Sequence, residues 1–315
     1  MISRKFAPIV VIGSINTDMV ATAPTLPAVG ETVMGKSFSV SAGGKGGNQA
    51  VAAARLGAEV TMVGSLGADA LGDQAIERLR KENIDCRHVM RDSEQASGVA
   101  LINVDKMGEN QIVVVPGANA TLSAEHIDKA FHNIVEGSIL LLQLEIPLAS
   151  VSRAIELAVE NNCQIILDPA PARALPSYLL ENVFLLTPNE IEAEILTGVK
   201  VTGESSAKEA ASVLLRRGVN NLAITLGGGG VFLASKNEHQ LIPATEVEAI
   251  DTTAAGDCFN GSLAVGLALG NELSQSIEFA CTAASISVTR AGAQDAMPFA
   301  HEVEIYGFPR GEKNC

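Results

Sequence analysis

The chain has 315 residues, 47% of them hydrophobic, and a formal net charge of −14. This size permits a large buried core, either in one α/β domain or in two smaller ones. Aromatic residues make up only 3% of the chain, and tryptophan is absent. Such an acidic chain with few stacking side chains suits nucleic acid poorly, so we expect no nucleic-acid partner. It is compatible with ATP, sugar phosphates and Mg²⁺, because single helix N-termini can bind phosphate within an acidic protein.

The five cysteines are scattered along the chain without a C-x-x-C pair. This pattern argues against a disulfide framework or zinc site and is typical of a reducing compartment. Near the N-terminus, a short apolar run is broken by Gly13 and Asp18, which favours a first strand over a signal peptide. No stretch approaches the roughly 18 apolar residues of a membrane span. We therefore expect a soluble cytoplasmic protein without membrane association.

The first part of the chain mixes strand-like and helical patterns. In chain order, we expect a strand over 8–12, strands and turns over 20–40, a glycine loop over 43–48 that opens a helix over 49–56, a strand over 59–63, a helix over 72–82 and strands over 97–115. The pieces at 20–40 and 97–115 both interrupt the helical rhythm. We expect these two pieces to pair with each other.

From about residue 123, helices and strands alternate. The predicted helices cover 124–135, 149–161, 189–196 and 207–217, and the predicted strands cover 139–144, 164–167, 184–186 and 221–226. This alternation indicates an α/β fold in which a mostly parallel central sheet is flanked by helices on both faces. No repeat or interdomain linker interrupts the chain. We predict a single domain over residues 1–315 with a small β insertion.

Polar residues gather where the predicted strands end, and parallel sheets bind ligands at the carboxyl ends of their strands. These residues are Asn16, Asp18, Gln143, Glu145, Asp168, Thr187, Asn189, Glu190, Glu192, Thr225 and the four glycines at 227–230. Each one taken alone also suits a turn or a helix cap. Polar groups at five or more strand ends together predict a binding crevice.

One stretch combines small residues with an acid at an expected helix start: Asp251-Thr252-Thr253-Ala254-Ala255-Gly256-Asp257-Cys258-Phe259-Asn260. It follows a strand-like run over 246–250 and precedes a run over 259–269 that can be helical. Free amides at such a helix start bind phosphate, and small residues let the phosphate approach closely. The residues alone leave two interpretations of Asp257 open: an ordinary N-cap, or a carboxylate that takes a proton from an attacking hydroxyl. The helix dipole should keep this carboxylate ionised near neutral pH, as a weak base.

Residues 30–37 satisfy the P-loop spacing G-x-x-x-x-G-K-S. That motif binds phosphate only between a strand and a helix. Here Pro24 and Pro27 precede it, a strand-like alternation follows it, and Glu31 adds a negative charge, so we reject the match. No G-x-G-x-x-G follows any predicted strand. The glycines at 227–230 precede a strand-like run, which favours a flexible loop lying against a nucleotide.

The chain resembles the ribokinase-like sugar kinases in several motifs that occur in the family's order. The two signatures are Gly43-Gly44-Lys45-Gly46-Gly47-Asn48 and the stretch from Asp251 to Asp257. Two further segments, at 13–18 and 189–192, agree with this family, and the resemblance extends from Val10 to about Pro298. It implies a three-layer fold with a small β-sheet lid, formed by two β insertions at about 18–42 and about 97–117. It also implies ATP-dependent phosphorylation of the 5-hydroxyl of D-ribose, and a homodimer that associates through the lid.

The same resemblance implies roles for individual residues. Asp257 matches the catalytic base, and the amides around Ala254, Ala255 and Gly256 match an anion hole. Ribose would be held by Asn16, Asp18, Gly44, Lys45, Gly46, Gly47, Asn48, Glu145 and Asp257. ATP would be bound by Asn189, Thr225, Gly227, Gly228, Gly229, Gly230, Gly256, Asp257 and Cys281. Glu192 would organise Mg²⁺ through water, and an activating K⁺ would be bound by Asp251, Thr253, Ser287, Arg290, Gly292 and Ala296.

Four residues depart from the commonest form of the family. Ala254 replaces a glycine of the anion hole, and Gly47 replaces an alanine of the sugar loop. Cys281 stands where a larger side chain can contact adenine, and Ala296 replaces a polar residue near the cation.

Two alternatives fit the same residues. A kinase of 2-deoxyribose, of another small sugar or of a nucleoside would share the fold, although Asn16, Asp18 and Asn48 favour a small polyol over a nucleoside. A non-catalytic sugar or ATP sensor would have lost Asp257 or its anion hole, and both are present.

Overall fold

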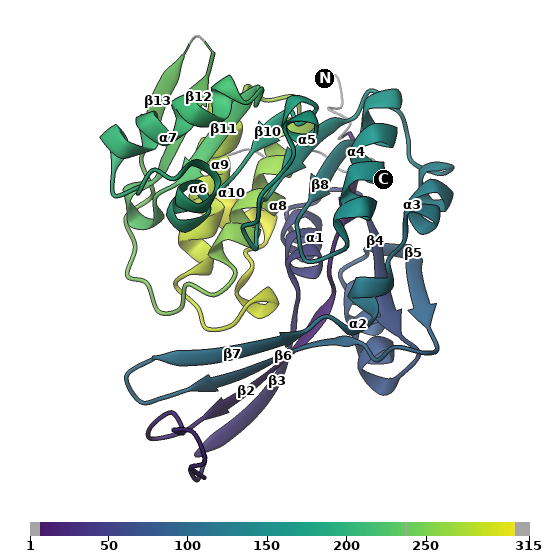
Figure 1. The fold of residues 1–315 in the computed structure, drawn as a ribbon, viewed down its shortest axis with the longest axis vertical. Coiled ribbons are helices and arrows are strands. Elements are labelled where there is room, and N and C mark those ends of the chain that lie inside the picture. The colour runs from purple at the N-terminus through teal and green to yellow at the C-terminus, as the bar shows by residue number, and fades with distance from the viewer. Residues whose placement is uncertain (1–6, 237, 306–315) are drawn as a thin grey trace.

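The computed structural model describes residues 7–236 and 238–305, so the predicted domain boundaries at 1 and 315 lie outside the described residues. The described chain forms a nine-stranded sheet covered by helices and a separate four-stranded sheet (Figure 1). No helix within these residues combines the length and apolar character needed to cross a membrane. The predicted α/β class, with a mostly parallel central sheet between helices, is confirmed.

The larger sheet is parallel except at one side. Its strands lie in the order β13 (His239–Ile242), β12 (Val231–Ser235), β11 (Asn221–Thr225), β10 (Leu185–Leu186), β9 (Gln164–Leu167), β8 (Ile139–Leu142), β1 (Ile9–Ile12), β4 (Val60–Gly67) and β5 (Asp85–Asp92). Only the pairs of β12 with β11 and with β13 are antiparallel. Parallel pairing brings the carboxyl ends of β1, β8, β9, β10 and β11 to one edge, where the predicted polar residues follow the strands.

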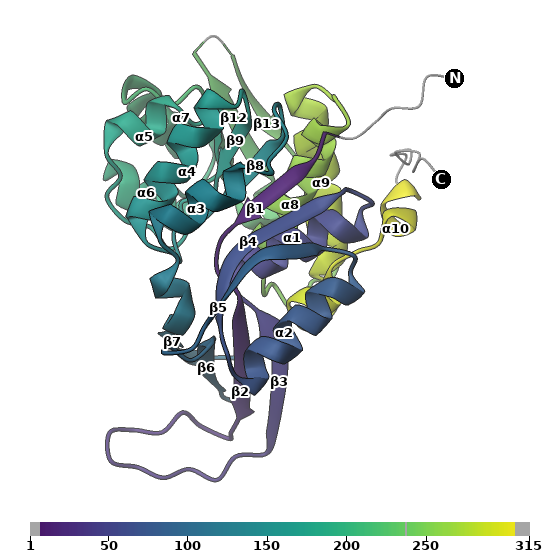
Figure 2. The ribbon, with the colours of Figure 1, turned by 90° about the vertical axis from the view of Figure 1, so that its right-hand side faces the viewer.

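Helices cover both faces of this sheet (Figures 1 and 2). One face carries α1 (Lys45–Arg55), α2 (Ala70–Lys81), α8 (Ala255–Ala268) and α9 (Leu273–Ser287). The other carries α3 (Ala124–Phe131), α4 (Leu148–Glu160), α5 (Ser177–Glu181), α6 (Glu190–Thr197) and α7 (Glu204–Arg216). In β1, Ile9 and Val11 belong to the first core and Val10 and Ile12 to the second. Successive side chains of a strand point to opposite faces, so a strand buried on both sides is a continuous apolar run.

The smaller sheet extends away from the helical layers, at the bottom of Figure 1. Its strands lie in the order β3 (Ser37–Gly43), β2 (Asn16–Thr22), β6 (Gly98–Val104) and β7 (Asn110–Val115). β2 and β6 pair in parallel, which confirms the predicted pairing of the two early strand-like pieces. β3 directly follows the false P-loop match, so the helix that a P-loop requires is absent from these described residues.

The remaining elements are three short turns of 3₁₀ helix and one terminal helix: η1 (Gly117–Thr121), η2 (Gly227–Gly229), η3 (Gln294–Ala296) and α10 (Ala300–Glu304). β5, β13 and α9 were not predicted from the sequence. The predicted strand over 246–250 is wrong, because these residues pair with no strand. Instead, the amides of Ile250 and Asp251 donate to the carbonyl of Val288 at the end of α9. The apolar residues Val247 and Ala249 of this segment line a cavity described below, which Glu246 also lines, and take no place in a sheet.

Close packing of α1 against α8 brings the first turns of the two helices together. Gly261 of α8 lies so near α1 that an added Cβ would stand 2.5 Å from the Gln49 carbonyl oxygen and 2.7 Å from the Ala52 Cβ. Real Cβ contacts of this length do not occur, so any larger residue would separate the helices.

We predict that Gly261→Ala lowers the free energy of unfolding by about 1–3 kcal/mol, as overpacked cores usually do. The matched control is Gly256→Ala in the first turn of α8, where an added Cβ meets no atom within 4 Å. Gly256→Ala should be as stable as the wild type or slightly more stable, because glycine disfavours the helix. Urea denaturation measures both. Equal stabilities for the two variants would contradict the packing argument.

Candidate active site

The site begins with two helix N-termini. α1 begins at Lys45 after Gly44, whose φ is 85°, and α8 begins at Ala255 after Ala254, whose φ is 58°. Both helices begin four residues earlier than the sequence suggested, so part of each predicted loop belongs to a helix. Gly46 allows the first turn of α1 to lie against the end of β1, since an added Cβ would stand 2.7 Å from the Gly13 carbonyl carbon.

Asp257 is buried at the third position of α8 and is not its N-cap. Its two carboxylate oxygens accept hydrogen bonds from α1: Oδ2 from Asn48 Nδ2 at 2.9 Å and Oδ1 from Gln49 Nε2 at 3.1 Å. The interpretation of Asp257 as an ordinary cap is therefore wrong, because its side chain bonds another helix. Sequence analysis had assigned Asn48 to this site but had missed Gln49.

Burial raises the pKa of Asp257, while Lys45, Asn48 and Gln49 oppose the increase. Asp257 is thus a stronger base than a carboxylate governed by the helix dipole alone would be. Burial would by itself lower the pKa of Lys45, but nearby carboxylates, led by those of Asp257 and Asp168, raise it above its ordinary value. Lys45 is therefore a half-buried cation that interacts with several carboxylates.

The predicted sugar residues lie on β2 and beside the start of α1. Asn16 Oδ1 accepts a hydrogen bond from Asn119 Nδ2 at 2.7 Å, which leaves the Asn16 amino group to donate elsewhere. Asp18 follows two residues later, on the same side of the strand. An added Cβ at Gly43 would stand 2.2 Å from Asp18 Oδ2, so this glycine makes room for the carboxylate. Asn119 comes from η1, far along the chain, and sequence analysis missed it.

Glu145 completes this group. Its Oε2 accepts hydrogen bonds from Ser14 Oγ at 2.5 Å and from the Lys45 backbone amide at 3.2 Å. Burial, with the charges of Glu145 and Asp257, raises the pKa of Asp18 to about 6. The structure therefore brings Asn16, Asp18 and Glu145 together with the α1 loop, as a polar cluster with an excess of acceptors.

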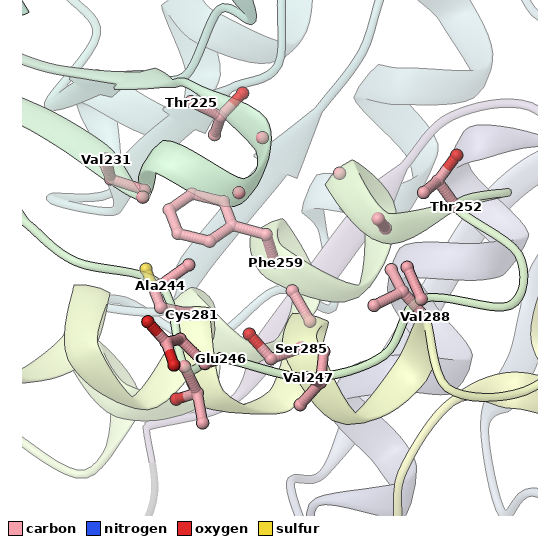
Figure 3. Close-up of a pocket in the computed structure, with 18 residues that line it drawn as sticks. Thr225, Val231, Ala244, Glu246, Val247, Thr252, Phe259, Cys281, Ser285 and Val288 are labelled. Atoms are coloured by element: carbon pink, nitrogen blue, oxygen red, sulfur yellow. The ribbon is translucent and has the colours of Figure 1, made fainter.

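A cavity of about 570 Å³ lies between η2, the segment after β13, and helices α8 and α9. The predicted residues Thr225, Gly227, Gly228, Gly230, Gly256 and Cys281 line it, whereas Gly229 belongs to the same turn but not to the lining. Figure 3 shows that the labelled residues of this lining come from separate segments, including Phe259 of α8 and Cys281 and Ser285 of α9. Phe259, Val231 and Val288 add apolar surface that sequence analysis missed. A mostly apolar slot with a glycine turn at one wall suits the flat base of a nucleotide.

A second cavity of about 190 Å³ adjoins the first and shares Thr225, Thr252, Ala255 and Gly256 with it. Its lining also contains Lys45, Asp168, Thr187, Asn189, Glu192, Ala254, Asp257 and Asn260. Asn189 therefore faces this smaller cavity and not the larger one. The Glu192 carboxylate caps α6 by accepting from the Asn189 amide at 2.8 Å through Oε2. The other carboxylate oxygen of Glu192 accepts no hydrogen bond from the described residues. It is therefore available to a water molecule.

Within the described residues, no group of three or more His, Cys, Asp or Glu side chains could hold a metal ion. Mg²⁺ usually keeps several waters and binds through one or two carboxylates together with substrate phosphates. The acid set of the smaller cavity, with Glu192 free at one oxygen, fits an ion held in that way.

Several of the residues predicted to bind a monovalent cation lie on two segments that hydrogen-bond to each other. The Asp251 carboxylate accepts from the Gly292 amide at 2.8 Å and from the Thr253 amide at 2.9 Å. The Arg290 side chain is paired with Glu302, so Arg290 would offer only its backbone carbonyl to a cation. Ser287 ends α9 next to this loop, and Ala296 is buried in η3. The segments 251–253 and 287–292 therefore form one structural unit.

Ala254 has a left-handed backbone, a conformation that only two other described non-glycine residues adopt, Asn83 and Asn162. We predict that Ala254→Gly keeps or raises the free energy of unfolding by up to about 1 kcal/mol, since glycine removes a strain of about 1–2 kcal/mol and loses part of that gain to unfolded-state entropy. The control is Ala54→Gly in α1, which should lose about 1 kcal/mol. Thermal unfolding compares them, and equal losses in both variants would count against strain at Ala254.

Asp18 should make the ligand-free protein less stable as pH rises. Its folded pKa lies above its unfolded value, so the folded state binds more protons between pH 4 and 6 and stability falls through that window. We expect its contribution to be about 1 kcal/mol more favourable at pH 5 than at pH 7. Urea denaturation of the wild type and Asp18→Asn at both pH values isolates this contribution. An unchanged difference between the two proteins at pH 5 and pH 7 would contradict it.

Comparison with known proteins agrees with this geometry. The family model described as pfkB family carbohydrate kinase matches residues 7–300. A ribokinase of Haemophilus influenzae is 44% identical over 292 residues, 93% of this chain and 95% of that protein. A deoxyribokinase of Salmonella typhi is 36% identical over 300 residues, 95% of this chain and 98% of that protein.

Among solved structures, Arabidopsis thaliana ribokinase complexed with ribose and ATP has a TM-score of 0.87 and 30% identity, over 96% of this chain and 100% of that one. The resemblance that the motifs suggested therefore covers nearly the whole chain, including the strands of the four-stranded sheet. The chain belongs to the pfkB family of carbohydrate kinases.

Proposed function

We propose that this kinase transfers the γ-phosphoryl group of MgATP to the 5-hydroxyl of D-ribose, with Asp257 as the general base. The observation that carries the proposal is the placement of Asp257. Its carboxylate is buried at the N-terminus of α8 and lines the smaller cavity, and its charge acts on Asp18 at the sugar end. The ribokinase name of one relative and the ribose and ATP of the Arabidopsis structure support the same substrates.

Hydrogen-bond chemistry supports a small polyol as acceptor. The Asn16 amino group donates to a sugar oxygen, because Asn119 already occupies its carbonyl oxygen. Asp18 and Glu145 accept from sugar hydroxyls, as does any carboxylate oxygen left free in the pocket. The glycines of the α1 loop, together with Lys45 and Asn48, close around the sugar without large side chains.

The two adjoining cavities support an extended nucleotide. The base and its ribose occupy the larger, apolar cavity beside Cys281 and η2, and the phosphates lie toward the start of α8. An added Cβ at Gly228 or at Gly256 would meet no atom within 4 Å, so both glycines leave open space for a ligand. Free amides and the dipole of α8 favour phosphate at Ala255 and Gly256.

In the reaction, the ribose O5 forms a bond to Pγ while the bond from Pγ to the bridging oxygen of ADP breaks. The O5 proton passes to Asp257, whose raised pKa suits a general base. The amides around Ala254, Ala255 and Gly256 stabilise charge on the transferring group. Since phosphoryl transfer requires mainly positioning and charge stabilisation, the site needs no covalent intermediate.

Two cations complete the proposed site. Glu192 would hold Mg²⁺ through water, and the ion would supply neutralisation of phosphate charge. The Asp251 carboxylate and mostly backbone oxygens of Thr253, Ser287, Arg290, Gly292 and Ala296 would hold K⁺. Its charge would fix the loop that leads into the anion hole, since Asp251 already bonds the amides of Thr253 and Gly292.

The four-stranded sheet is proposed as the lid of a single domain, and as the surface of a homodimer. One face of this sheet leaves large apolar side chains in solvent: Phe38, Val40, Leu101 and Val113, which the strand pairings place side by side. Contiguous exposed apolar surface of this kind marks an interaction site.

The second candidate is a 2-deoxyribokinase, which the Salmonella typhi relative supports. The two differ in the oxygen that the pocket must recognise. The acceptor-rich group of Asn16, Asp18 and Glu145 favours ribose, because a missing hydroxyl would leave a buried polar group without a partner.

We predict that purified protein consumes ATP most efficiently with D-ribose, less with 2-deoxyribose, and little with fructose or adenosine. Replacing K⁺ by choline should lower the rate. A coupled ADP assay gives kcat/KM for each sugar under both conditions. Higher kcat/KM for any other acceptor would overturn the choice of ribose, and equal rates without K⁺ would overturn the cation site.

We predict that Asp257→Asn lowers kcat by at least about 10²–10⁴, the usual loss for a positioned general base. D-ribose binding, measured by calorimetry, should survive. Asp69→Asn is the matched control, because Asp69 is a true N-cap whose side chain accepts from the Gly72 amide. That control should keep its turnover. Near-normal turnover of Asp257→Asn would remove Asp257 from the chemistry.

A further inference from the structure

Both polar atoms of the Gln49 side chain make hydrogen bonds within the protein. Gln49 is 0% exposed, in the first half of α1. Its Oε1 accepts a hydrogen bond from Gln143 Nε2 at 2.6 Å. Its Nε2 donates to Asp168 Oδ2 at 2.8 Å and to Asp257 Oδ1 at 3.1 Å. One amide group therefore joins the ends of β8 and β9 to the start of α8.

The orientation of this amide is fixed by its partners. A flip would bring Oε1 against two carboxylates and Nε2 against the Gln143 amino group, so that all three hydrogen bonds would be lost. Gln143 lies against Gly13, where an added Cβ would stand 1.9 Å from Gln143 Oε1, and that oxygen is buried without a hydrogen-bond partner among the described residues. The two carboxylates therefore fix the Gln49 amide, and its Oε1 in turn holds the Gln143 amino group.

This arrangement of hydrogen bonds fixes the orientation of the Asp257 carboxylate. Asn48 anchors one of its oxygens and Gln49 the other. Asn48 belongs to the sugar loop, and its own Oδ1 is buried without a partner. Gln49 lines neither the larger nor the smaller cavity. Gln49 is therefore the anchor of Asp257 that does not depend on a bound substrate.

We propose that Gln49 is a positioning residue: its amide, locked by Gln143 and Asp168, holds the Asp257 carboxylate in the orientation that receives the proton of the acceptor hydroxyl. This inference rests on the proposed role of Asp257 as base. It assigns to Gln49 an effect on turnover, with no direct contact to sugar or nucleotide.

A pH profile separates this role from simple structural support. Burial raises the pKa of Asp257, and the hydrogen bond from Gln49 lowers it. Removing that donor should raise the pKa further, so the acidic limb of kcat should move to higher pH. A residue that only stabilises the fold would lower the amount of active enzyme without moving the limb.

The test compares Gln49→Met with the wild type, using D-ribose and MgATP between pH 5 and 9. Methionine keeps the length of the side chain and suits a helix, but it donates no hydrogen bond. We expect kcat to fall by about 10–100-fold, KM values to stay within about threefold, and the acidic limb to rise by about half a pH unit or more. Gln143→Met removes the hydrogen bond to Gln49 Oε1 while leaving α1 unchanged. It should lower kcat and move the acidic limb to higher pH, both by less than Gln49→Met does.

Ser150→Ala is the structural control. It removes a buried hydroxyl that donates to the Leu122 carbonyl at 2.6 Å, on the other face of the sheet, and should leave the pH profile unchanged. Wild-type kcat and pH profile in Gln49→Met, with Asp257→Asn inactive, would overturn this inference alone. If Gln49→Met does not fold, a wild-type profile in Gln143→Met overturns it. An active Asp257→Asn would instead overturn the proposed function.

Discussion

The site depends on the close contact between α1 and α8. Gly261 removes the side chain that would hold the two helices apart, and the hydrogen bond from Asn48 to Asp257 joins their first turns. In the proposed mechanism the two N-termini have different roles, since the start of α1 would bind the sugar and the start of α8 would offer amides to phosphate. The two adjoining cavities lie near this contact, beside the carboxyl ends of the parallel strands.

Burial of this contact brings several carboxylates close together. Their desolvation and mutual repulsion are unfavourable. Asp18, Asp168, Glu192 and Asp257 all have raised pKa values, chiefly because of burial. The half-buried Lys45 side chain offsets them, and its pKa is raised in turn. This excess of negative charge would suit the proposed reaction, whose substrates bring Mg²⁺ and hydroxyl donors. The same crowding gives Asp257 a basicity that the helix dipole would not provide.

The fold and the polar half of the site could be predicted from the sequence, because each rests on local signals. Apolar runs alternating with helical patterns indicated the parallel sheet, and the small residues before Asp257 indicated a helix start there. The apolar half of the site could not be predicted, because Phe259, Val231 and Val288 look like ordinary core residues in the sequence. Only the fold places them around one cavity. Gln49 and Asn119 were missed for a related reason. Their significance lies in partners about a hundred residues away or more, which no local pattern encodes. The strand expected over 246–250 failed because the apolar residues of this segment line a cavity and pair with no strand.

The central claim is that Asp257 faces the acceptor hydroxyl while the start of α8 holds the phosphates. A crystal structure with D-ribose, Mg²⁺ and a non-hydrolysable ATP analogue tests this most directly. It should place the sugar O5 within hydrogen-bond distance of an Asp257 carboxylate oxygen, and the γ-phosphate against the amides of Ala255 and Gly256. Phosphates bound at residues 30–37, or a sugar whose O5 points away from Asp257, would contradict the account.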